Sequence, residues 1–329
     1  MLKNFQKYSF SSIYITVIIA VLIWLGSFIN PITNNTEVYY SDLAQLFNHW
    51  INLLGKGKIF LAFIIILSQA AMLASFSNKF KTFGKNTFLA GIIYIILTAP
   101  HDVQTFNPVI IANIFVIWSL GILLKSIEKK KATTNFFSVA ILMAIASLIY
   151  PQYVLITLFT LAATLVVRSK LTKEFFAVIL GFILIYALYA EIYFLTQGSW
   201  AEIKSFTQIF ENKAIKYIQN WYFLAFFGFY SIVFMISSAN ILKNIGYKEI
   251  DKRTIFQLIF TFFIFTIITY LIIPSVGINF FATIAIPLTF LFGDFFADLK
   301  PKLSNRIIFW LFIAFGFTFY AENIISLFE

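Results

Sequence analysis

The residues best suited to chemistry are histidines and carboxylates that fall between apolar segments. His101 and Asp102 are adjacent in a polar stretch bounded by Pro100 and Pro108, with apolar runs on either side. An imidazole and a carboxylate can hold a divalent cation, such as Mg or Mn, or act as a general base. Because the flanking runs are short, the stretch is expected at membrane depth, inside a protein-lined cavity. The alternative is an ordinary proline-bounded turn that faces water.

A second group of ionisable residues could bind a lipid substrate. Glu191 lies about one turn inside the end of an apolar run, where a charge is costly and therefore a candidate for function. Snorkelling towards the interface explains the same position. Lys204, Lys213 and Lys216 occupy a predicted outer segment and could bind a lipid phosphate. A solvated helix face that contacts headgroups nonspecifically gives the same pattern.

The composition identifies the environment in which these residues work. Of 329 residues, 60% are apolar and only 12% are charged, which is too little charge to cover a soluble domain of this size. Lipid must therefore be the solvent for most of the surface. The absence of cysteine excludes disulfides, cysteine-ligated metals and cysteine nucleophiles. No P-loop, DxD, GxSxG or HExxH motif occurs, so nothing supports cytosolic nucleotide chemistry.

The elements that must position the candidates are apolar segments long enough to cross a bilayer. A spanning helix needs roughly 20 apolar residues, and about 17 suffice where the bilayer thins. The sequence predicts an all-α fold: one integral membrane domain over residues 1–329, a polytopic bundle of transmembrane helices with about 11 spans. The segments lie near 10–30, 58–76, 87–100, 108–124, 134–150, 152–167, 175–195, 221–242, 254–273, 276–292 and 307–325.

The distribution of positive charge predicts the orientation of these spans. Most of the 24 Lys and Arg residues fall in alternate connections, and positive residues in short loops are retained in the cytoplasm. An amino terminus inside and a carboxyl terminus outside follow from this pattern. On the inner side, Asp294 and Asp298 are expected to pair with Lys300 or Lys302.

Two predicted outer loops are long enough to contain helices of their own. In residues 31–57, apolar residues recur at steps of three and four from Tyr39 to Leu54, with polar residues on the other side. A weaker stripe of the same kind occurs in 196–220. Both segments are predicted to be amphipathic helices lying in the outer interface rather than crossing the membrane.

This arrangement resembles the GT-C superfamily of membrane glycosyltransferases. The resemblance covers roughly the first eight predicted spans and extends to residues 36–44, where Glu37 and the pair Tyr39 and Tyr40 look similar to the family segment after the first span. The catalytic aspartate of the family would fall on Thr36. The resemblance therefore implies that Glu37 or, in reserve, Asp42 supplies the catalytic carboxylate, unless the fold is kept without the chemistry.

The resemblance implies transfer of a sugar from a polyprenyl-phosphate-linked donor on the outer face. A carboxylate would act on the acceptor, and a divalent cation held by His101 and Asp102 would neutralise the phosphate. Tyr39, Tyr40 and His49 would contact the substrate, together with the Glu191 and lysine candidates.

Two other functions stay open. One is a noncatalytic membrane subunit or scaffold that contacts other envelope membrane proteins, and a less favoured one is a transporter of a lipid or small molecule. The nearly uncharged centres of the spans disfavour the transporter. The chain also resembles polytopic membrane protein families of Bacteroidota, which places it in a bacterial inner membrane. Membrane lipids are expected partners, and nucleic acid is not.

Overall fold

The computed structural model describes residues 10–29, 55, 57–84, 87–129, 131–168, 173–197, 210, 221–298 and 303–317. Within these residues the regular structure is helical, and an α-helix falls on each of the predicted apolar segments. The all-α prediction is therefore confirmed for the described part of the chain. The elements are α2 (Phe10–Ile29), α4 (Gly57–Lys79), α5 (Leu89–Leu97), η1 (His101–Gln104), α6 (Pro108–Ile127), α7 (Thr133–Ile149), η2 (Pro151–Tyr153), α8 (Val154–Val167), α9 (Lys173–Gln197), α11 (Trp221–Asn244), η3 (Ile245–Tyr247), α12 (Ile250–Ile272), η4 (Ile278–Phe280), α13 (Phe281–Asp298) and α14 (Leu303–Gly316).

Seven of the described helices are long and apolar enough to cross a membrane. They are α2, α4, α6, α9, α11, α12 and α13, whereas α7, α8 and α14 are apolar but shorter. Large apolar side chains remain exposed on the outside of the bundle, including Leu180 on α9, Met235 on α11 and Leu271 on α12. Lipid is the natural solvent for such a surface. The protein is therefore a helical protein compatible with integration into a membrane.

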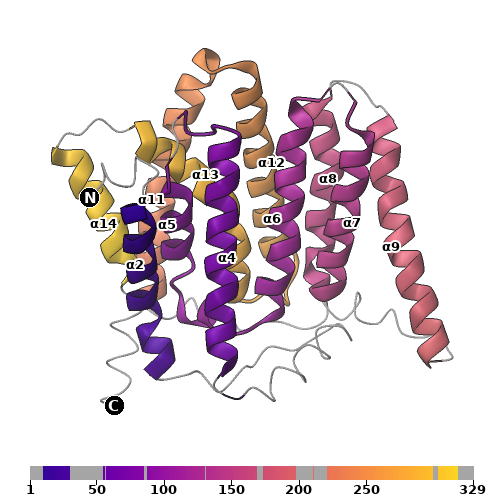
Figure 1. Cartoon of the computed structure of the whole chain (residues 1–329), viewed down its shortest axis with the longest axis horizontal. Helices are drawn as coiled ribbons and strands as arrows, with labels where there is room; N and C mark the ends of the chain where they lie inside the picture. Colours follow the sequence, from indigo (N-terminus) through magenta and orange to yellow (C-terminus); the bar gives the residue numbers. More distant parts are fainter. Residues whose placement is uncertain are drawn as a thin grey trace.

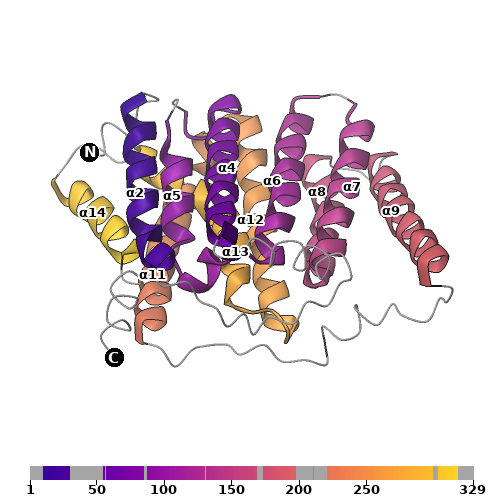
Figure 2. The same ribbon diagram turned by 60° about the horizontal axis from the view of Figure 1, so that its bottom comes forward.

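Successive helices run in opposite directions, so the connections alternate between the two ends of the bundle (Figures 1 and 2). The connections after α4, α6, α8 and η3 gather at one end, called the basic end below. The turns η1, η2 and η4 lie at the opposite end, called the η1 end. The basic end contains Lys81, Lys129, Arg168, Lys248 and Arg253 among the described residues. The charge pattern predicts that this end faces the cytoplasm.

Helix α5 is much shorter than the predicted segment 87–100. Its nine residues rise about 14 Å, which is half of the roughly 30 Å hydrocarbon core. Every residue from Leu89 to Leu97 is buried, so the helix lies inside protein rather than against lipid. Non-helical backbone on either side is tolerated at this depth because neighbouring helices surround it.

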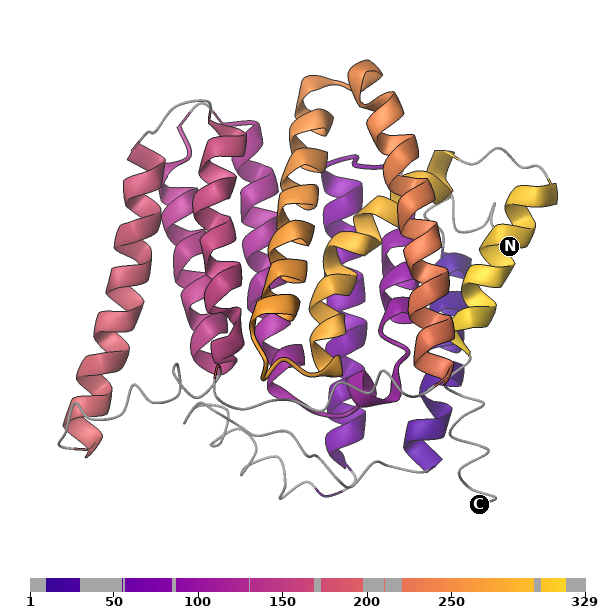
Figure 3. The same ribbon diagram turned by 180° about the vertical axis from the view of Figure 1, so that it is seen from behind.

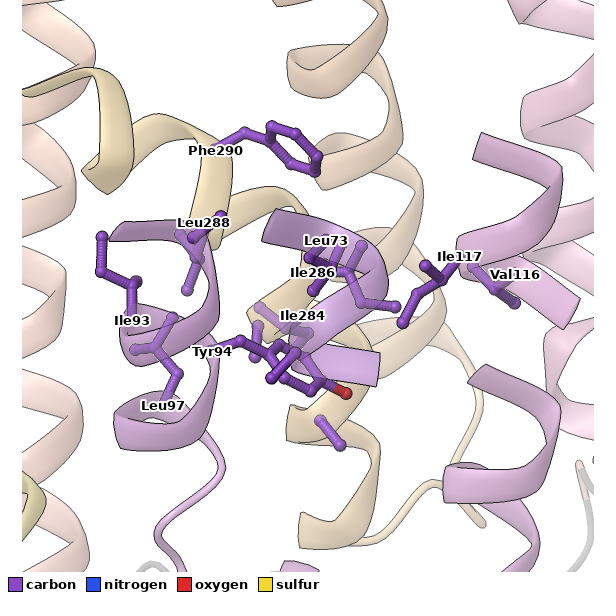
Figure 4. Packing of buried hydrophobic residues seen from close by; sticks show 14 of the residues in the cluster. Leu73, Ile93, Tyr94, Leu97, Val116, Ile117, Ile284, Ile286, Leu288 and Phe290 are labelled. Carbon is purple, nitrogen blue, oxygen red and sulfur yellow. The ribbon is translucent and has the colours of Figure 1, made fainter. Parts of the chain in front are cut away.

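Helix α13 forms the centre of the bundle and covers α5. It packs against α5, α6, α11 and α12, and every residue from Phe281 to Ala297 is buried. Figure 3 shows α13 running obliquely between α11 and α12. Figure 4 shows Tyr94 of α5 pointing towards Ile284 of α13, whereas Ile93 lies on the other side of α5. The apolar run around Pro287 is thus a core helix, apolar on all sides because it is surrounded on all sides.

A buried ion pair holds α13 at the basic end. The Lys248 ammonium lies 2.5 and 2.6 Å from the two carboxylate oxygens of Asp294, and the Lys248 and Asp294 side chains are only 14% and 4% exposed. The same ammonium lies 4.2 Å from the centre of the Phe256 ring. The predicted partners Lys300 and Lys302 lie outside the described residues, so that pairing stays a prediction. Among the described residues, Asp294 pairs with a lysine from the connection between α11 and α12, a contact that the packing of α13 creates and that sequence spacing does not indicate.

Helix α9 lies at the edge of the bundle and packs on α7 and α8. Close approach to α7 depends on Gly181, where an added Cβ would lie 2.7 Å from the Ala140 Cβ. Small residues at such crossings let helix backbones approach closely in a membrane. The Tyr186 and Ser147 hydroxyls, 2.6 Å apart, also join the two helices. Most of the remaining surface of α9 is exposed and apolar.

Candidate functional site

The polar stretch between α5 and α6 folds as predicted into an irregular segment near the η1 end. Pro100 precedes the turn η1, and Asn107 caps α6 by accepting a hydrogen bond from the Ile110 amide at 3.1 Å. Pro108 occupies the first turn of α6, where its missing N–H costs nothing. The local sequence therefore ends one helix, forms a short turn and starts the next within ten residues or so.

Gln104 fixes this turn against the rest of the bundle. Its side-chain amide donates to the Ala99 carbonyl at 2.8 Å and to the Ile23 carbonyl of α2 at 3.4 Å, and its carbonyl accepts from the Ser27 hydroxyl. Gln104 is buried, as is Ser27. The sequence does not single out Gln104, because no spacing pattern connects it to Ile23 of α2, 81 residues earlier.

His101 and Asp102 are partly buried on η1, and burial changes the pKa of both. Loss of water lowers the pKa of His101 to about 4, so the imidazole is neutral at physiological pH. Burial also raises the pKa of Asp102. The His101 Nε2 atom has no hydrogen-bond partner among the described residues. A neutral imidazole with a vacant nitrogen can accept a proton or bind a cation.

The lowered pKa of His101 predicts a pH dependence of stability. The folded protein binds a proton at His101 less tightly than the unfolded chain does. The contribution of His101 to the free energy of unfolding is therefore lost as the pH falls from 6.5 towards 4. Lowering the pH from 7 to 5 should reduce the free energy of unfolding of the wild type by about 2 kcal/mol more than that of His101→Gln. Thermal unfolding in detergent measures this difference. Asp102 is present in both proteins, so its titration cancels, and parallel pH profiles would contradict the assignment.

The neighbours of η1 connect it to other predicted site residues. The turn contacts α2, α4 and η4. Helix α2 ends at Ile29 and α4 begins at Gly57, so η1 lies against both helices that flank residues 30–56. That segment carries Glu37 and Asp42, which lie outside the described residues. The fold thus places the turn that carries His101 and Asp102 against both helices that flank the segment with the predicted catalytic carboxylates.

Glu191 is the one other predicted site residue within the described ranges, and it does not lie next to η1. Glu191 is exposed on α9, at the opposite side of the bundle from α5 (Figures 1 and 2). Within the described ranges no group of three His, Asp or Glu residues could hold a metal ion. Tyr39, Tyr40, His49, Lys204, Lys213 and Lys216, with nearly all of the two predicted interfacial helices, lie outside the described residues.

Hydrogen bonds between buried side chains join the helices on the inner side of the site. At the η1 end, the Gln152 amide of η2 donates to the Ser275 hydroxyl at 3.3 Å. Deeper in the bundle, the hydroxyls of Tyr153 and Thr283 lie 2.7 and 3.0 Å from the Asn113 side-chain oxygen. These bonds connect η2, α6 and α13. Paired polar groups of this kind fix one arrangement of the helices, because each would be costly if left unpaired in an apolar interior.

A second pair in the same region joins α4 to α5. The Tyr94 hydroxyl donates to the Gln69 side-chain oxygen at 2.7 Å, and the Gln69 amide donates to a backbone carbonyl of α6 at 2.5 Å. Tyr94 and Gln69 are fully buried. Together with α13, this pair holds the short helix α5 in place, and with it the turn η1 that follows.

Comparison with known proteins gives one match. A family model described as "Family of unknown function (DUF6427)" matches residues 35–328. No curated protein and no solved structure matches the chain.

Proposed function

We propose that this chain, which belongs to the DUF6427 family of unknown function, transfers a sugar from a lipid-linked donor at the η1 end of the bundle. The protein lies in a bacterial inner membrane, with its basic end in the cytoplasm and its η1 end outside. The charge at the basic end supports this orientation. The donor is a polyprenyl-phosphate-linked sugar, as the resemblance to the GT-C superfamily implies.

One observation carries the proposal: η1, with His101 and Asp102, lies against both helices that flank the segment of Glu37 and Asp42. Sugar transfer from a lipid phosphate needs a carboxylate near the acceptor and a positive group near the leaving phosphate. Glu37 supplies the first. The neutral imidazole of His101, with its vacant Nε2, fits a cation ligand that is completed by Asp102 and a carboxylate of the 30–56 segment.

A second function, a noncatalytic scaffold, is favoured by the position of Glu191. This residue faces outwards on α9 instead of joining η1, and the described residues alone assemble no metal site. In a scaffold the same exposed helix would contact another envelope membrane protein. The buried polar bonds around α5 would then serve stability only.

Deleting the gene in its source organism tests the transferase. The substrate of a missing transferase accumulates, so lipid extracts should contain more polyprenyl-phosphate-linked sugar than extracts of the wild type. Mass spectrometry of the extracts measures this change, and expression of the full chain should reverse it. An unchanged lipid pool would contradict the transferase and favour the scaffold.

A further inference from the structure

An apolar groove lies on the outside of the bundle between α11 and α12, with α13 as its floor. Figure 3 shows the arrangement of these three helices. Its volume is about 230 Å³. The α11 and α12 side chains that form its walls are mostly half-buried, whereas the α13 side chains beneath them are buried. The lining residues are Phe227, Tyr230, Ser231, Phe234, Phe263, Ile267, Tyr270, Ile278, Phe281, Ile284 and Leu288.

The groove extends from the η1 end to the middle of α11 and α12. Along its floor, the ten-residue step from Ile278 to Leu288 corresponds to about 15 Å along the helix axis. At its inner end, the rings of Phe234 and Phe263 stack with their centres 4.5 Å apart and join α11 to α12. The groove therefore lies in the half of the bundle that, under the proposed orientation, is nearer the outer face.

The lining is complementary to uncharged hydrocarbon. It includes no charged side chain, and the Tyr230 hydroxyl is already used in a 2.9 Å hydrogen bond to the Phe312 carbonyl of α14. The groove continues into the lipid-facing surface of its two walls, where Met235 is 71% and Leu271 is 70% exposed. A chain that enters sideways from the bilayer would thus exchange one apolar surrounding for another, with closer packing against aromatic rings.

We propose that this groove binds the single isoprenoid chain of the lipid-linked donor. The site is smaller than the roughly 300–1,000 Å³ clefts that enclose whole small molecules, so it fits a short stretch of one chain, with the rest of the chain left in the bilayer. Its outer end includes Ile278 of η4, and η4 contacts η1. A lipid whose chain fills the groove therefore carries its phosphate towards His101 and Asp102. The inference rests on the proposed function, because that function supplies the identity of the lipid.

The groove can be blocked after the protein has folded, because the natural chain contains no cysteine. Ser231→Cys places a single thiol in the lining, and Ile236→Cys places one at a half-exposed position on the opposite side of the same helix as the matched control. Each purified full-length variant is treated with a bulky maleimide. Native mass spectrometry in detergent then measures binding of added undecaprenyl phosphate and, separately, of phosphatidylethanolamine.

We expect unmodified Ser231→Cys, modified Ile236→Cys and the wild type to bind one undecaprenyl phosphate alike. Modified Ser231→Cys should bind it at least tenfold more weakly. Equal binding by both modified proteins, or no binding by the wild type, would overturn the proposal. A preference for phosphatidylethanolamine would also overturn the proposal. So would a dimer of the protein that dissociates only when residue 231 is modified, because a second copy of the chain would then occupy the groove.

These outcomes separate the groove from the transferase. Undecaprenyl phosphate bound in the groove, without accumulation of lipid-linked sugar in the deletion strain, would keep the lipid site and refute the transferase. Accumulation without binding would support the transferase and refute the groove as its chain site.

Discussion

Replacing Asp294 with alanine is expected to lower the free energy of unfolding by roughly 3–5 kcal/mol. The substitution leaves the Lys248 ammonium buried beside Phe256 without the carboxylate that now lies 2.5 Å away. An unpaired buried charge lowers the free energy of unfolding by far more than the net contribution of the pair. Both groups are already largely removed from water, so the remaining ammonium has neither water nor a carboxylate to stabilise it. Chemical or thermal unfolding of the purified protein in detergent measures the change.

Two variants control for other causes of this loss. Glu249→Ala removes the exposed partner of the 3.3 Å ion pair with Lys252 and should change stability by less than about 1 kcal/mol, because water already solvates Glu249. The double variant Lys248→Met with Asp294→Ala removes both charges and should recover much of the lost stability. A double variant as unstable as Asp294→Ala would show that packing, rather than the unpaired charge, causes the effect.

The second large effect is expected in the transfer reaction. Glu37→Gln should lower the rate about 10²–10⁴-fold, the usual range when a general base is lost. Asp102→Asn should also lower the rate, because it removes a proposed ligand of the cation that neutralises the leaving phosphate. The lipid-linked sugar that accumulates in the deletion strain serves as donor in membrane vesicles containing each variant. Asp42→Asn tests the reserve carboxylate in the same assay. Membrane insertion should remain normal, because these polar side chains contribute little to a bundle held by buried packing.

The controls for catalysis lie at the basic end, far from η1. Glu128→Gln and Asp251→Asn make the same chemical changes at exposed positions and should leave the rate unchanged. If Glu37→Gln, Asp42→Asn and Asp102→Asn all retain the full rate, the transferase fails and the scaffold becomes the preferred function. A loss shared equally by the controls would instead indicate a change in expression or insertion.

The positions of the helices could be predicted from the sequence because lipid imposes a local rule. A helix that faces hydrocarbon must be apolar over its own length, so the long spans α4, α6, α9 and α12 are visible in the sequence without knowledge of their neighbours. The irregular turn at His101 and Asp102 was also predictable. Pro100 and Pro108 interrupt the apolar pattern locally.

Features that depend on neighbours distant in the sequence were not predictable in this way. In the sequence, the apolar segment that contains α5 is as long as a short transmembrane span. Only the packing of α13 over α5 shows that α5 lies in the interior of the bundle. The separation of Glu191 from η1 follows from the place of α9 at the edge of the bundle, which hydropathy does not encode. The groove depends on how far α11 and α12 diverge over α13, a matter of packing geometry.

The complete burial of α13 also affects the order in which the helices can assemble during synthesis. Ribosomes add about 5–20 residues per second, so the chain between Leu97 and Phe281 takes on the order of 10–40 s to synthesise. Throughout that interval α5 has emerged but lacks the helix that covers it, and it is too short to stay across the bilayer alone. A nascent chain that stops before residue 281 therefore has α5 packed on α2 and α4 but lacks the helix that covers its remaining surface.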